Sequence, residues 1–398
     1  MKKNTRKYIL GLSALFSCLL TVSTPTPAQS TTGVTDKEIL IGSCSALEGP
    51  SQFLGRETVN GAKAYFDMTN DAGGVDGRKL KLISYDDSYD PGKTEACFNR
   101  LMEQKVFALG FFVGTPTAVK YVPMAESNKI PLVGLFTGAQ TLYVPMRHWV
   151  VNVRASYFDE TREQIDGMWG TLGYKKIGVI YPEDAFGGAV LEGVKAALKT
   201  HGAEPVAAAS YQRQTAQAGS AIDTVRAANP EAVVIVGPAN TVAPILKQSH
   251  ARGWKPLFLT VSFVGTDDLI AEAGSDADGV VITQVVPPYY LTDRKTVALY
   301  RRTLTKYFPT AQPSFVSLEG FVDAMVLVEG LKRAGKDLTR EGLIRGIESI
   351  HELDIGLGPQ LKLDYSSKDH KGFDHVIPTV IRGGRAVPFT DWSMVSPK

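Results

Sequence analysis

The stretch VFALGFFVGTPTAVKYVPMAESNKIPLVGLFTG, residues 106–138, decides the fold that we expect for this chain. Residues 106–113 form a continuous apolar run of strand length, which is typical of a strand buried on both faces in a parallel sheet. After Gly114, Thr115 offers an N-cap oxygen and Pro116 suits the first helical position, so a helix is predicted to begin there.

The second strand of this stretch brings further side chains to the same edge of the sheet. Residues 130–135 predict a strand that is followed by Phe136-Thr137-Gly138. This tripeptide brings an aromatic ring and a third hydroxyl to the edge that carries the hydroxyls of Thr115 and Thr117. The first free N–H groups of the helix, including that of Thr117, point out of this edge. Because helix N-termini favour anions, we expect a carboxylate to bind here, the alternative being an ordinary capped crossover helix.

The composition is that of a globular protein, except at the start. The chain has 398 residues, 44% hydrophobic and 21% charged, which is long enough for two domains. Residues 1–28 combine a basic beginning, an apolar stretch and the small-x-small tripeptide Thr26-Pro27-Ala28. This pattern predicts a secretory signal cleaved after Ala28 and therefore a periplasmic or extracellular protein. A lipoprotein signal, with Cys18 as the lipidated residue, is the competing interpretation.

The charge of the remaining chain gives no sign of a nucleic-acid partner. Removing residues 1–28 takes away four of the 43 Lys and Arg and none of the 41 Asp and Glu, which leaves a formal charge of −2. No basic run with interleaved aromatics appears. No other apolar run reaches the ~18 residues that a membrane span needs, so a soluble mature chain is expected.

Two cysteines, Cys44 and Cys97, remain after the signal. In an exported protein an even count suggests a disulfide, which would stabilise the chain by roughly 4 kcal/mol in the chain-entropy model. Two separate buried thiols are the alternative.

Predicted strands and helices alternate along the chain at intervals of roughly 25–30 residues, which indicates βαβ units and parallel sheets. Strands are expected at 39–44, 80–86, 106–113, 130–135, 176–181, 205–211, 232–237, 257–261, 279–285, 360–364 and 376–382. Helices are expected at 55–71, 91–104, 159–172, 186–201, 218–228, 242–252, 267–273, 293–308, 314–334 and 340–347, besides the one at 115. The simplest account is two doubly wound α/β lobes.

Sequence motifs of enzymes are missing. There is no G-x-x-x-x-G-K-[ST] loop, no G-x-G-x-x-G after a strand and no G-x-S-x-G elbow. The six histidines show no paired metal-ligand spacing, and His370 and His375 are expected in a solvated turn. We therefore predict no catalytic residues, no metal and no cofactor.

Polar and aromatic residues gather instead at the carboxyl ends of strands in both lobes, where open α/β sheets bind ligands. The first lobe supplies residues 48–54, Thr115, Thr117, Phe136 and Thr137, and the second supplies residues 184–187, 238–241, Ser262 and Phe263. Two lobes that face each other at these edges would form a cleft that closes over a small molecule.

The chain resembles the type I periplasmic solute-binding proteins of ABC importers, in particular the Leu/Ile/Val-binding protein group. Four motifs carry the likeness, which spans residues 37–382: ILIGSCSALEGPSQFLGRETVNGAKAYFDMTNDAGGVDGRKLKLISYDDSYDPGK at 39–93, GTPTAVKYVPMAESNKIPLVG at 114–134, KKIGVIYPEDAFGGAVLEGVKAALKTHG at 175–202 and DHKGFD at 369–374.

The resemblance implies a fold of two lobes joined by three crossover hinge segments, near 148–156, 284–290 and 374–378. Lobe 1 would comprise residues 37–150 and 287–374, and lobe 2 residues 151–286 and 375–398. It also implies a monomer that binds a small solute in the cleft, performs no chemistry on it, and passes it to an ABC permease in the membrane.

By the same resemblance, site roles fall on particular positions. Thr115 would hold a ligand carboxylate, with Phe136 and Thr137 or Gly138 contributing at the next strand end. Phe186 would form an aromatic wall. Ala239 or Asn240 would contact an amino group.

Departures from the family pattern weaken the amino-acid interpretation. The acidic residue that pairs with the ligand ammonium in Leu/Ile/Val binders is replaced by Ser262, and a buried ammonium without a carboxylate is costly. Asp184 or Glu319 could substitute, or the ligand could lack the amino group. The family tyrosine of the first turn is replaced by Leu54, and the relatives' cystine would join the positions of Tyr89 and Gly114.

We therefore expect an exported component of an ABC importer that binds an apolar amino acid or a related carboxylate or amide. A periplasmic sensor that feeds a signalling receptor is the second hypothesis, and an exported enzyme on the same scaffold is the third.

Overall fold

The computed structural model describes residues 31–335 and 338–395 together with Met1. The predicted signal, its cleavage site after Ala28 and Cys18 lie outside these described residues. The described residues from Thr31 onward form one compact unit. Among the described residues, no helix has the length and apolar character to cross a membrane.

The first lobe is built on a parallel five-stranded sheet with the order β2-β1-β3-β4-β5. Its strands are β1 (Glu38–Ser45), β2 (Lys79–Asp86), β3 (Ala108–Gly110), β4 (Leu132–Val133) and β5 (Val150–Val151). Three helices follow the strands, α1 (Gln52–Asp71), α2 (Pro91–Glu103) and α3 (Thr115–Ser127).

The late helices pack on this lobe, as the family resemblance implies. They are α9 (Lys295–Tyr307), α10 (Phe315–Ala334) and α11 (Arg340–Glu348), and α10 packs against α1 and α11. Two glycines allow the close approach of α1 and α10. A Cβ atom on Gly61 would lie 1.9 Å from the Ser317 carbonyl oxygen, and one on Gly320 would lie 2.1 Å from that of Thr58. Helix α10 is therefore held rigidly against the first lobe.

The second lobe is built on a seven-stranded sheet with the order β14-β13-β10-β9-β8-β6-β7. Five strands are parallel, and β13 and β14 add an antiparallel edge. The sequence predicts only one strand here, at 376–382. The strands are β6 (Ile177–Pro182), β7 (Ala207–Tyr211), β8 (Ala232–Ile235), β9 (Leu257–Val261), β10 (Val281–Gln284), β13 (Ile377–Arg382) and β14 (Arg385–Pro388).

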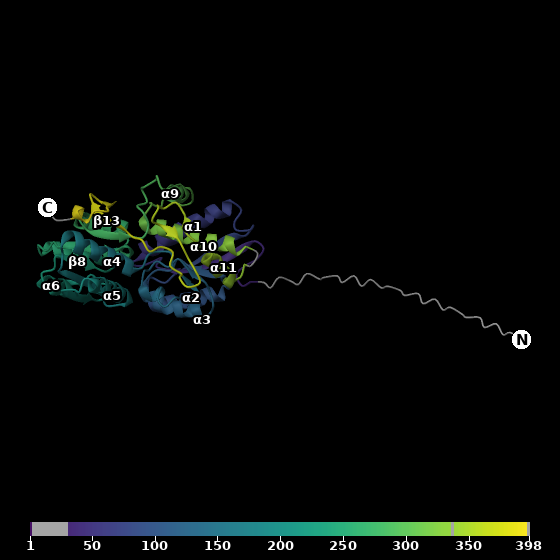
Figure 1. Ribbon diagram of the computed structural model, residues 1–398, viewed down its shortest axis with the longest axis horizontal. Helices are drawn as coiled ribbons and strands as arrows, with labels where there is room; N and C mark the ends of the chain where they lie inside the picture. Colours follow the sequence, from purple (N-terminus) through teal and green to yellow (C-terminus); the bar gives the residue numbers. More distant parts are fainter. Residues whose placement is uncertain (2–30, 336–337, 396–398) are drawn as a thin grey trace. The chain divides into compact units, whose positions relative to one another are not determined.

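Five α-helices accompany this sheet, and Figure 1 shows α4, α5 and α6 in the teal part of the ribbon together with β8. They are α4 (Tyr157–Gly167), α5 (Ala185–Thr200), α6 (Gly219–Ala227), α7 (Ala239–Ala251) and α8 (Thr266–Ala273). The sequence predicts one helix at 159–172. In the structure this region consists of α4 followed by a π-helical turn, η2 (Met168–Leu172). The pair β11 (Leu353–Asp354) and β12 (Lys362–Leu363) forms a separate small sheet.

Two central strands are shorter than the sequence predicts. The run at 106–113 yields only β3, and that at 130–135 only β4, because Phe111 and Gly134 take positive φ values of 65° and 67°. These left-handed residues interrupt the extended backbone at matching points, where the Phe111 N–H still donates to the Gly134 carbonyl at 2.9 Å. The apolar pattern therefore reports burial correctly but not strand length.

The chain passes between the two sheets three times. The connections run from β5 to α4, from β10 to α9 and from β12 to β13. They coincide with the crossover segments predicted near 148–156, 284–290 and 374–378, while the exact lobe boundaries stay a prediction.

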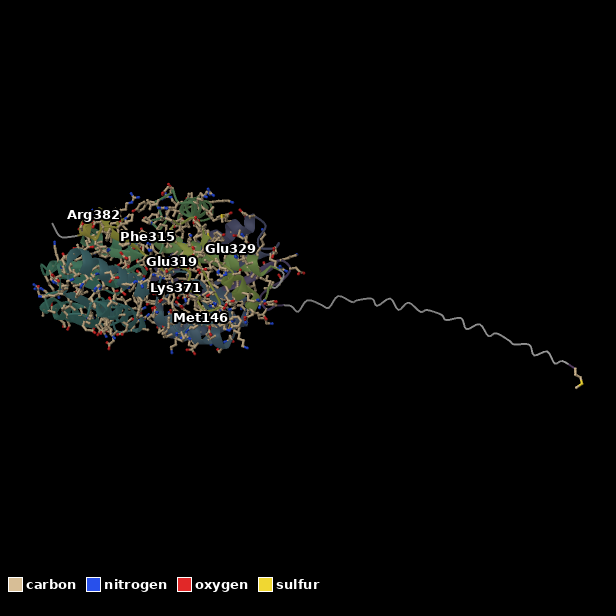
Figure 2. All side chains as sticks on the ribbon, viewed as in Figure 1. Met146, Phe315, Glu319, Glu329, Lys371 and Arg382 are labelled. Carbon is tan, nitrogen blue, oxygen red and sulfur yellow. A yellow bond between two sulfur atoms is a disulfide. The ribbon has the colours of Figure 1, made fainter. Side chains whose placement is uncertain are left out.

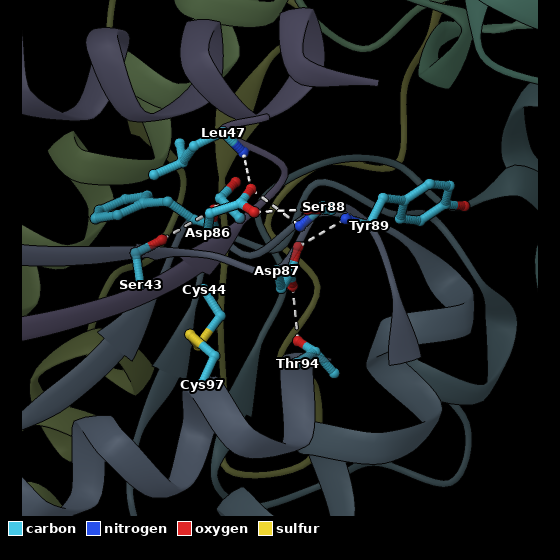
Figure 3. The surroundings of a disulfide bond; sticks show 11 residues. Ser43, Cys44, Leu47, Asp86, Asp87, Ser88, Tyr89, Thr94 and Cys97 are labelled. Atoms are coloured by element: carbon cyan, nitrogen blue, oxygen red, sulfur yellow. Dashed lines mark hydrogen bonds between the residues drawn. A yellow bond between two sulfur atoms is a disulfide. The ribbon is translucent and has the colours of Figure 1, made fainter. Parts of the chain in front are cut away.

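A disulfide ties the first lobe together near one end of its sheet (Figure 3). Cys44 of β1 and Cys97 of α2 are bonded, and both are buried. Beside them, Asp87 accepts hydrogen bonds from Thr94 Oγ1 at 2.7 Å and from the Tyr89 N–H at 2.9 Å. The start of α2 is thereby fixed to the loop that carries Tyr89.

Candidate ligand-binding site

Helix α3 begins one residue earlier than predicted, and this changes the role of Thr115. Gly114 is the N-cap residue, with φ of 97°, and a Cβ atom there would lie 1.9 Å from the Tyr89 ring. The prediction that Thr115 caps the helix is therefore wrong. Its Oγ1 atom lies 2.7 Å from Thr137 Oγ1 instead, and both hydroxyls are buried.

Thr117 does not join this hydroxyl pair. Its Oγ1 atom donates to the Gly114 carbonyl at 2.8 Å and also bonds the Val113 carbonyl, so the side chain turns back onto its own helix. Only its N–H remains a candidate for ligand contact.

The first residue of α4 closes over the second turn of the opening stretch. The Tyr157 N–H donates to the Gly138 carbonyl at 2.7 Å, and Tyr157 Oη lies 3.4 Å from Thr137 Oγ1. A Cβ atom on Gly138 would lie 2.8 Å from the Tyr157 nitrogen. Glycine at 138 thus permits the crossover chain to approach the hydroxyl pair.

Aromatic rings from both lobes meet around Phe263, which lies in the short 3-10 turn η3 (Ser262–Val264). Its ring centroid is 4.5 Å from Phe186 in the same lobe, and 5.5 Å and 5.8 Å from Phe136 and Tyr89 in the other lobe. Tyr157 lies 5.4 Å from Phe186 and completes the cluster. All five rings are buried, so the lobes share an apolar contact at the predicted cleft.

Leu54 lies against the same turn. A Cβ atom on Gly265 would come within 2.8 Å of Leu54 Cδ2, so α1 of the first lobe contacts the second lobe here. Leu54 is buried, and its contact with a ligand stays a prediction.

In the part of the chain that the structure describes, Asn240 forms no hydrogen bond with the aromatic cluster or the hydroxyl pair. It is the second residue of α7 and is partly exposed, and its Oδ1 atom has no hydrogen-bond partner. Ala239, the alternative for this position, is buried as the first residue of the helix.

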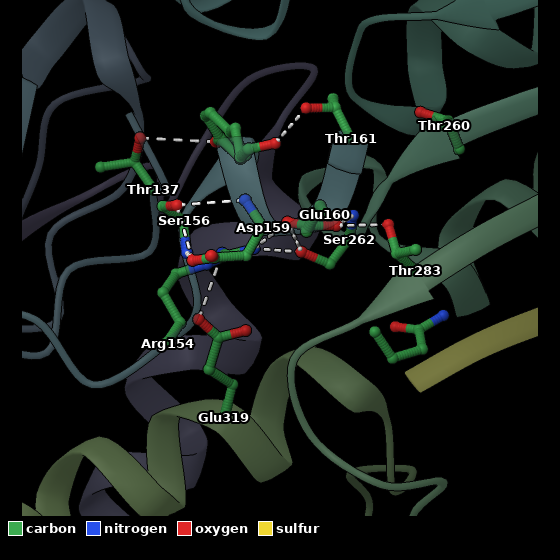
Figure 4. Close-up of polar contacts among 12 residues, drawn as sticks. Thr137, Arg154, Ser156, Asp159, Glu160, Thr161, Thr260, Ser262, Thr283 and Glu319 are labelled. Atoms are coloured by element: carbon green, nitrogen blue, oxygen red, sulfur yellow. Dashed lines mark hydrogen bonds and ion pairs between the residues drawn. The ribbon is translucent and has the colours of Figure 1, made fainter. Parts of the chain in front are cut away.

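A buried arginine that the sequence analysis missed lies at the centre of the polar half of the site (Figure 4). Arg154 comes from the first crossover segment and is 2% exposed. Its guanidinium pairs with Glu160 at 3.1 Å and with Glu319 at 3.2 Å, and it donates to Ser262 Oγ. It also lies 5.2 Å from the ring centroid of Phe136. The only feature of the sequence that pointed to Arg154 was its position in a predicted crossover segment.

Glu160 of α4 places a buried carboxylate against Ser262. It accepts hydrogen bonds from the Ser262 N–H at 2.7 Å, from Ser262 Oγ at 2.8 Å and from Thr283 Oγ1 at 2.9 Å. Burial raises the pKa of Glu160, while the Arg154 charge and these hydrogen bonds oppose the rise. Ser262 therefore holds an acid from a neighbouring helix, and Arg154 balances its charge.

Glu319 reaches the same arginine from α10 (Figure 4), the helix on which Figure 2 also labels Phe315. Burial raises the pKa of Glu319 to about 7, because the charge of Arg154 only partly offsets the lost hydration and Glu160 adds repulsion. Arg154 thereby links Glu319 of the first lobe to Glu160 and Ser262 of the second.

Two further contacts join the lobes near the aromatic cluster. Arg213 of the second lobe donates to the Tyr89 carbonyl, and its Nε atom lies 2.9 Å from Asp184 Oδ2. Asp267 of α8 accepts a hydrogen bond from the Phe315 N–H at the start of α10, at 3.1 Å. The described arrangement is therefore one in which the lobes are in contact.

The sequence predicts His370 in a solvated turn, and this prediction is wrong. His370 is buried, not solvated, with Nδ1 at 3.0 Å from the Val150 carbonyl and Nε2 at 3.1 Å from Glu348 Oε1. It lies against the first crossover segment, where the Asn152 N–H donates to the His370 carbonyl at 2.9 Å. Within residues 31–335 and 338–395, no group of three or more His, Cys, Asp or Glu is placed to hold a metal ion.

A periplasmic binding protein family model matches residues 38–384, which is most of the chain. The chain belongs to the periplasmic binding protein family. The fold described above is thus the type I fold of this family, and its relatives are solute-binding proteins. The resemblance drawn from the four sequence motifs is confirmed.

Three similar proteins illustrate the relationship. A possible leucine/isoleucine/valine-binding protein from Rhodopirellula baltica has a crystal structure that superposes with a TM-score of 0.86 and 31% identity, covering 93% of this chain and 100% of that one. An amino acid binding protein of Pseudomonas aeruginosa is 26% identical, over 74% of this chain and 77% of its own. The leucine-specific-binding protein of Salmonella typhimurium is 23% identical, over 94% and 96%.

Proposed function

We propose that this chain is an exported solute-binding protein that captures a small organic solute between its lobes and delivers it to an ABC importer. The solute is an apolar amino acid or a related carboxylate or amide. One observation supports this most strongly: the hydroxyl pair of Thr115 and Thr137 adjoins buried rings from both lobes.

The arrangement suits a molecule with one polar end and one apolar end. The hydroxyls at the start of α3, near its positive end, suit a carboxylate. The rings of Phe136, Phe186 and Phe263 suit an apolar group. Relatives named for leucine and for amino acids support the amino-acid class.

The polar half offers a partner for an ammonium group without an acid at position 262. Asp184 is occupied, because it caps α5 through the N–H groups of Phe186 and Gly187 at 2.9 Å and pairs with Arg213. Glu319 has Arg154 as its ion-pair partner, and its Oε1 atom has no well-formed hydrogen bond. Of the two substitutes named from the sequence, we therefore favour Glu319.

A thermal-shift screen of the purified chain from Gln29 onward tests the proposal. The panel comprises amino acids, their deaminated hydroxy and keto acids, aromatic acids and small amides. A ligand at 100 times its dissociation constant should raise the unfolding free energy by about 2.7 kcal/mol. A clear shift with apolar amino acids or related acids is expected, whereas a panel without any shift would contradict the proposal.

A further inference from the structure

The ring of Phe263 occupies a position between the lobes that bears on ligand size. It is fully buried, and its neighbours are Phe186 from its own lobe and Phe136 and Tyr89 from the other lobe. The centroid separations of 4.5–5.8 Å place these rings in contact. The planes of the three neighbouring rings are tilted by 43–51° to that of Phe263, so these rings do not form a parallel-walled slot for a flat group.

The backbone around Phe263 is fixed from both sides. The preceding residue, Ser262, bonds Glu160 through both its N–H and its hydroxyl. The turn ends at Gly265, with φ of 74°, where Leu54 of the first lobe fills the space that a side chain would need. Phe263 therefore cannot leave its place by a small shift of its own loop while the lobes are in contact.

Phe263 also lies beside the part of the site that would take the apolar end of a ligand. Phe136 directly precedes Thr137, whose hydroxyl pairs with that of Thr115. A ligand held by these hydroxyls would extend its apolar group toward Phe136, and Phe263 already covers that ring at 5.5 Å.

We propose that Phe263 is a specificity-determining residue that limits the solute to a small apolar group, of about the size of the alanine or valine side chain. This inference rests on the proposed function, and deepens it by naming the size class of the solute. Larger branched or aromatic side chains would meet the Phe263 ring before the lobes come together.

The experiment measures dissociation constants by calorimetry for glycine, L-alanine, L-valine, L-leucine and L-phenylalanine, and for the corresponding 2-hydroxy acids. We expect the wild-type chain to bind the alanine or valine member of one series at least tenfold more tightly than the leucine and phenylalanine members. Equal or tighter binding of the phenylalanine member would overturn the proposal while leaving the proposed function intact. Absence of binding in both series would count against both.

Variants at this position give the second arm. Phe263→Ala and the milder Phe263→Leu should shift the ratio of leucine to alanine affinity at least tenfold toward leucine. Phe258→Leu is the matched control, because Phe258 is a buried ring of the same lobe that packs on Trp254 at 5.7 Å. An unchanged ratio in a folded Phe263 variant would refute the size limit. If neither variant folds, the wild-type size series decides.

Discussion

Arg154 Nη1 lies 3.2 Å from Glu319 Oε1, and this ion pair joins the first crossover segment to helix α10. The same guanidinium pairs with Glu160 of the second lobe at 3.1 Å. One positive charge thus faces two carboxyl groups in a buried site, and Asp323, one turn further along α10, adds a third with an unpaired Oδ2 atom. Burial raises the pKa of Glu319 and of Asp323, which favours their neutral forms, and a ligand ammonium beside Glu319 would favour its charged form.

Glu319→Gln should selectively weaken the binding of ligands that carry an ammonium group. The loss should be about 3–5 kcal/mol, as for a buried charge pair that loses one partner. Calorimetry with an amino acid and its 2-hydroxy analogue measures it. Glu329→Gln is the control, because Glu329 lies on the same helix and pairs with Arg333 at 2.7 Å. Equal losses for both ligands would show that Glu319 does not face an ammonium.

The pKa of Glu319 predicts how the unfolding free energy of the unliganded chain changes with pH. The folded chain keeps this proton up to about pH 7, whereas an ordinary glutamate loses it near 4.5. Since the folded state then binds more protons than the unfolded state, stability should fall as pH rises from about 4.5 to 7. The charged groups facing Glu319 are those of Arg154, Glu160 and Asp323, with Tyr143 also nearby.

Denaturant titrations between pH 4.5 and 7.5 on wild type and Glu319→Gln check this expectation. Asp87 and Asp268, whose pKa values are raised by burial to about 6, contribute in the same direction, so the difference between the two proteins isolates Glu319. Parallel pH curves for the two proteins would rule out the assigned pKa.

Thr115→Ala should reduce the affinity for a carboxylate ligand by about 1–3 kcal/mol, because it removes a hydrogen bond to a charged group. Thr69→Ala is the control, since Thr69 is a buried threonine of the same lobe that bonds the Tyr65 carbonyl. Ligand affinity should fall in the Thr115 variant and stay unchanged in the Thr69 variant. An unchanged affinity in a folded Thr115→Ala protein would remove this residue from the site.

Replacing both disulfide cysteines, Cys44→Ala with Cys97→Ala, should lower the unfolding free energy. The bond spans 53 residues of sequence, for which the chain-entropy model gives about 4 kcal/mol. Denaturant unfolding of the double variant, compared with wild type before and after reduction, measures the change. A loss below about 1 kcal/mol would contradict the chain-entropy account.

Apolar periodicity and turn residues, which are local signals, predicted the order of elements and the two lobes, and the family resemblance implied the three crossovers. It placed Thr115, Phe136, Thr137, Phe186 and Ser262 at strand ends, and the structure brings these together around Phe263 and Arg154. Their roles in ligand binding stay predictions.

What the sequence missed depends on contacts between distant residues. Arg154 is 108 residues from Ser262, so no local sequence pattern predicts that both residues bond the buried carboxylate of Glu160. Phe111 lies in an apolar run that predicts a strand, yet it takes a positive φ, and its N–H donates to the Gly134 carbonyl. Thr117 has the right type and position for a ligand contact, but its hydroxyl bonds its own helix.

Hydrogen exchange of the unmodified chain, with and without a solute from the thermal-shift panel, tests the central claim most directly. If the solute binds between the lobes, added protection should concentrate in residues 113–118 and 135–138 of the first lobe and 184–188 and 261–266 of the second. Protection confined to one lobe, or to the surface pocket lined by His250, Lys255 and Asp276, would contradict an interlobe site.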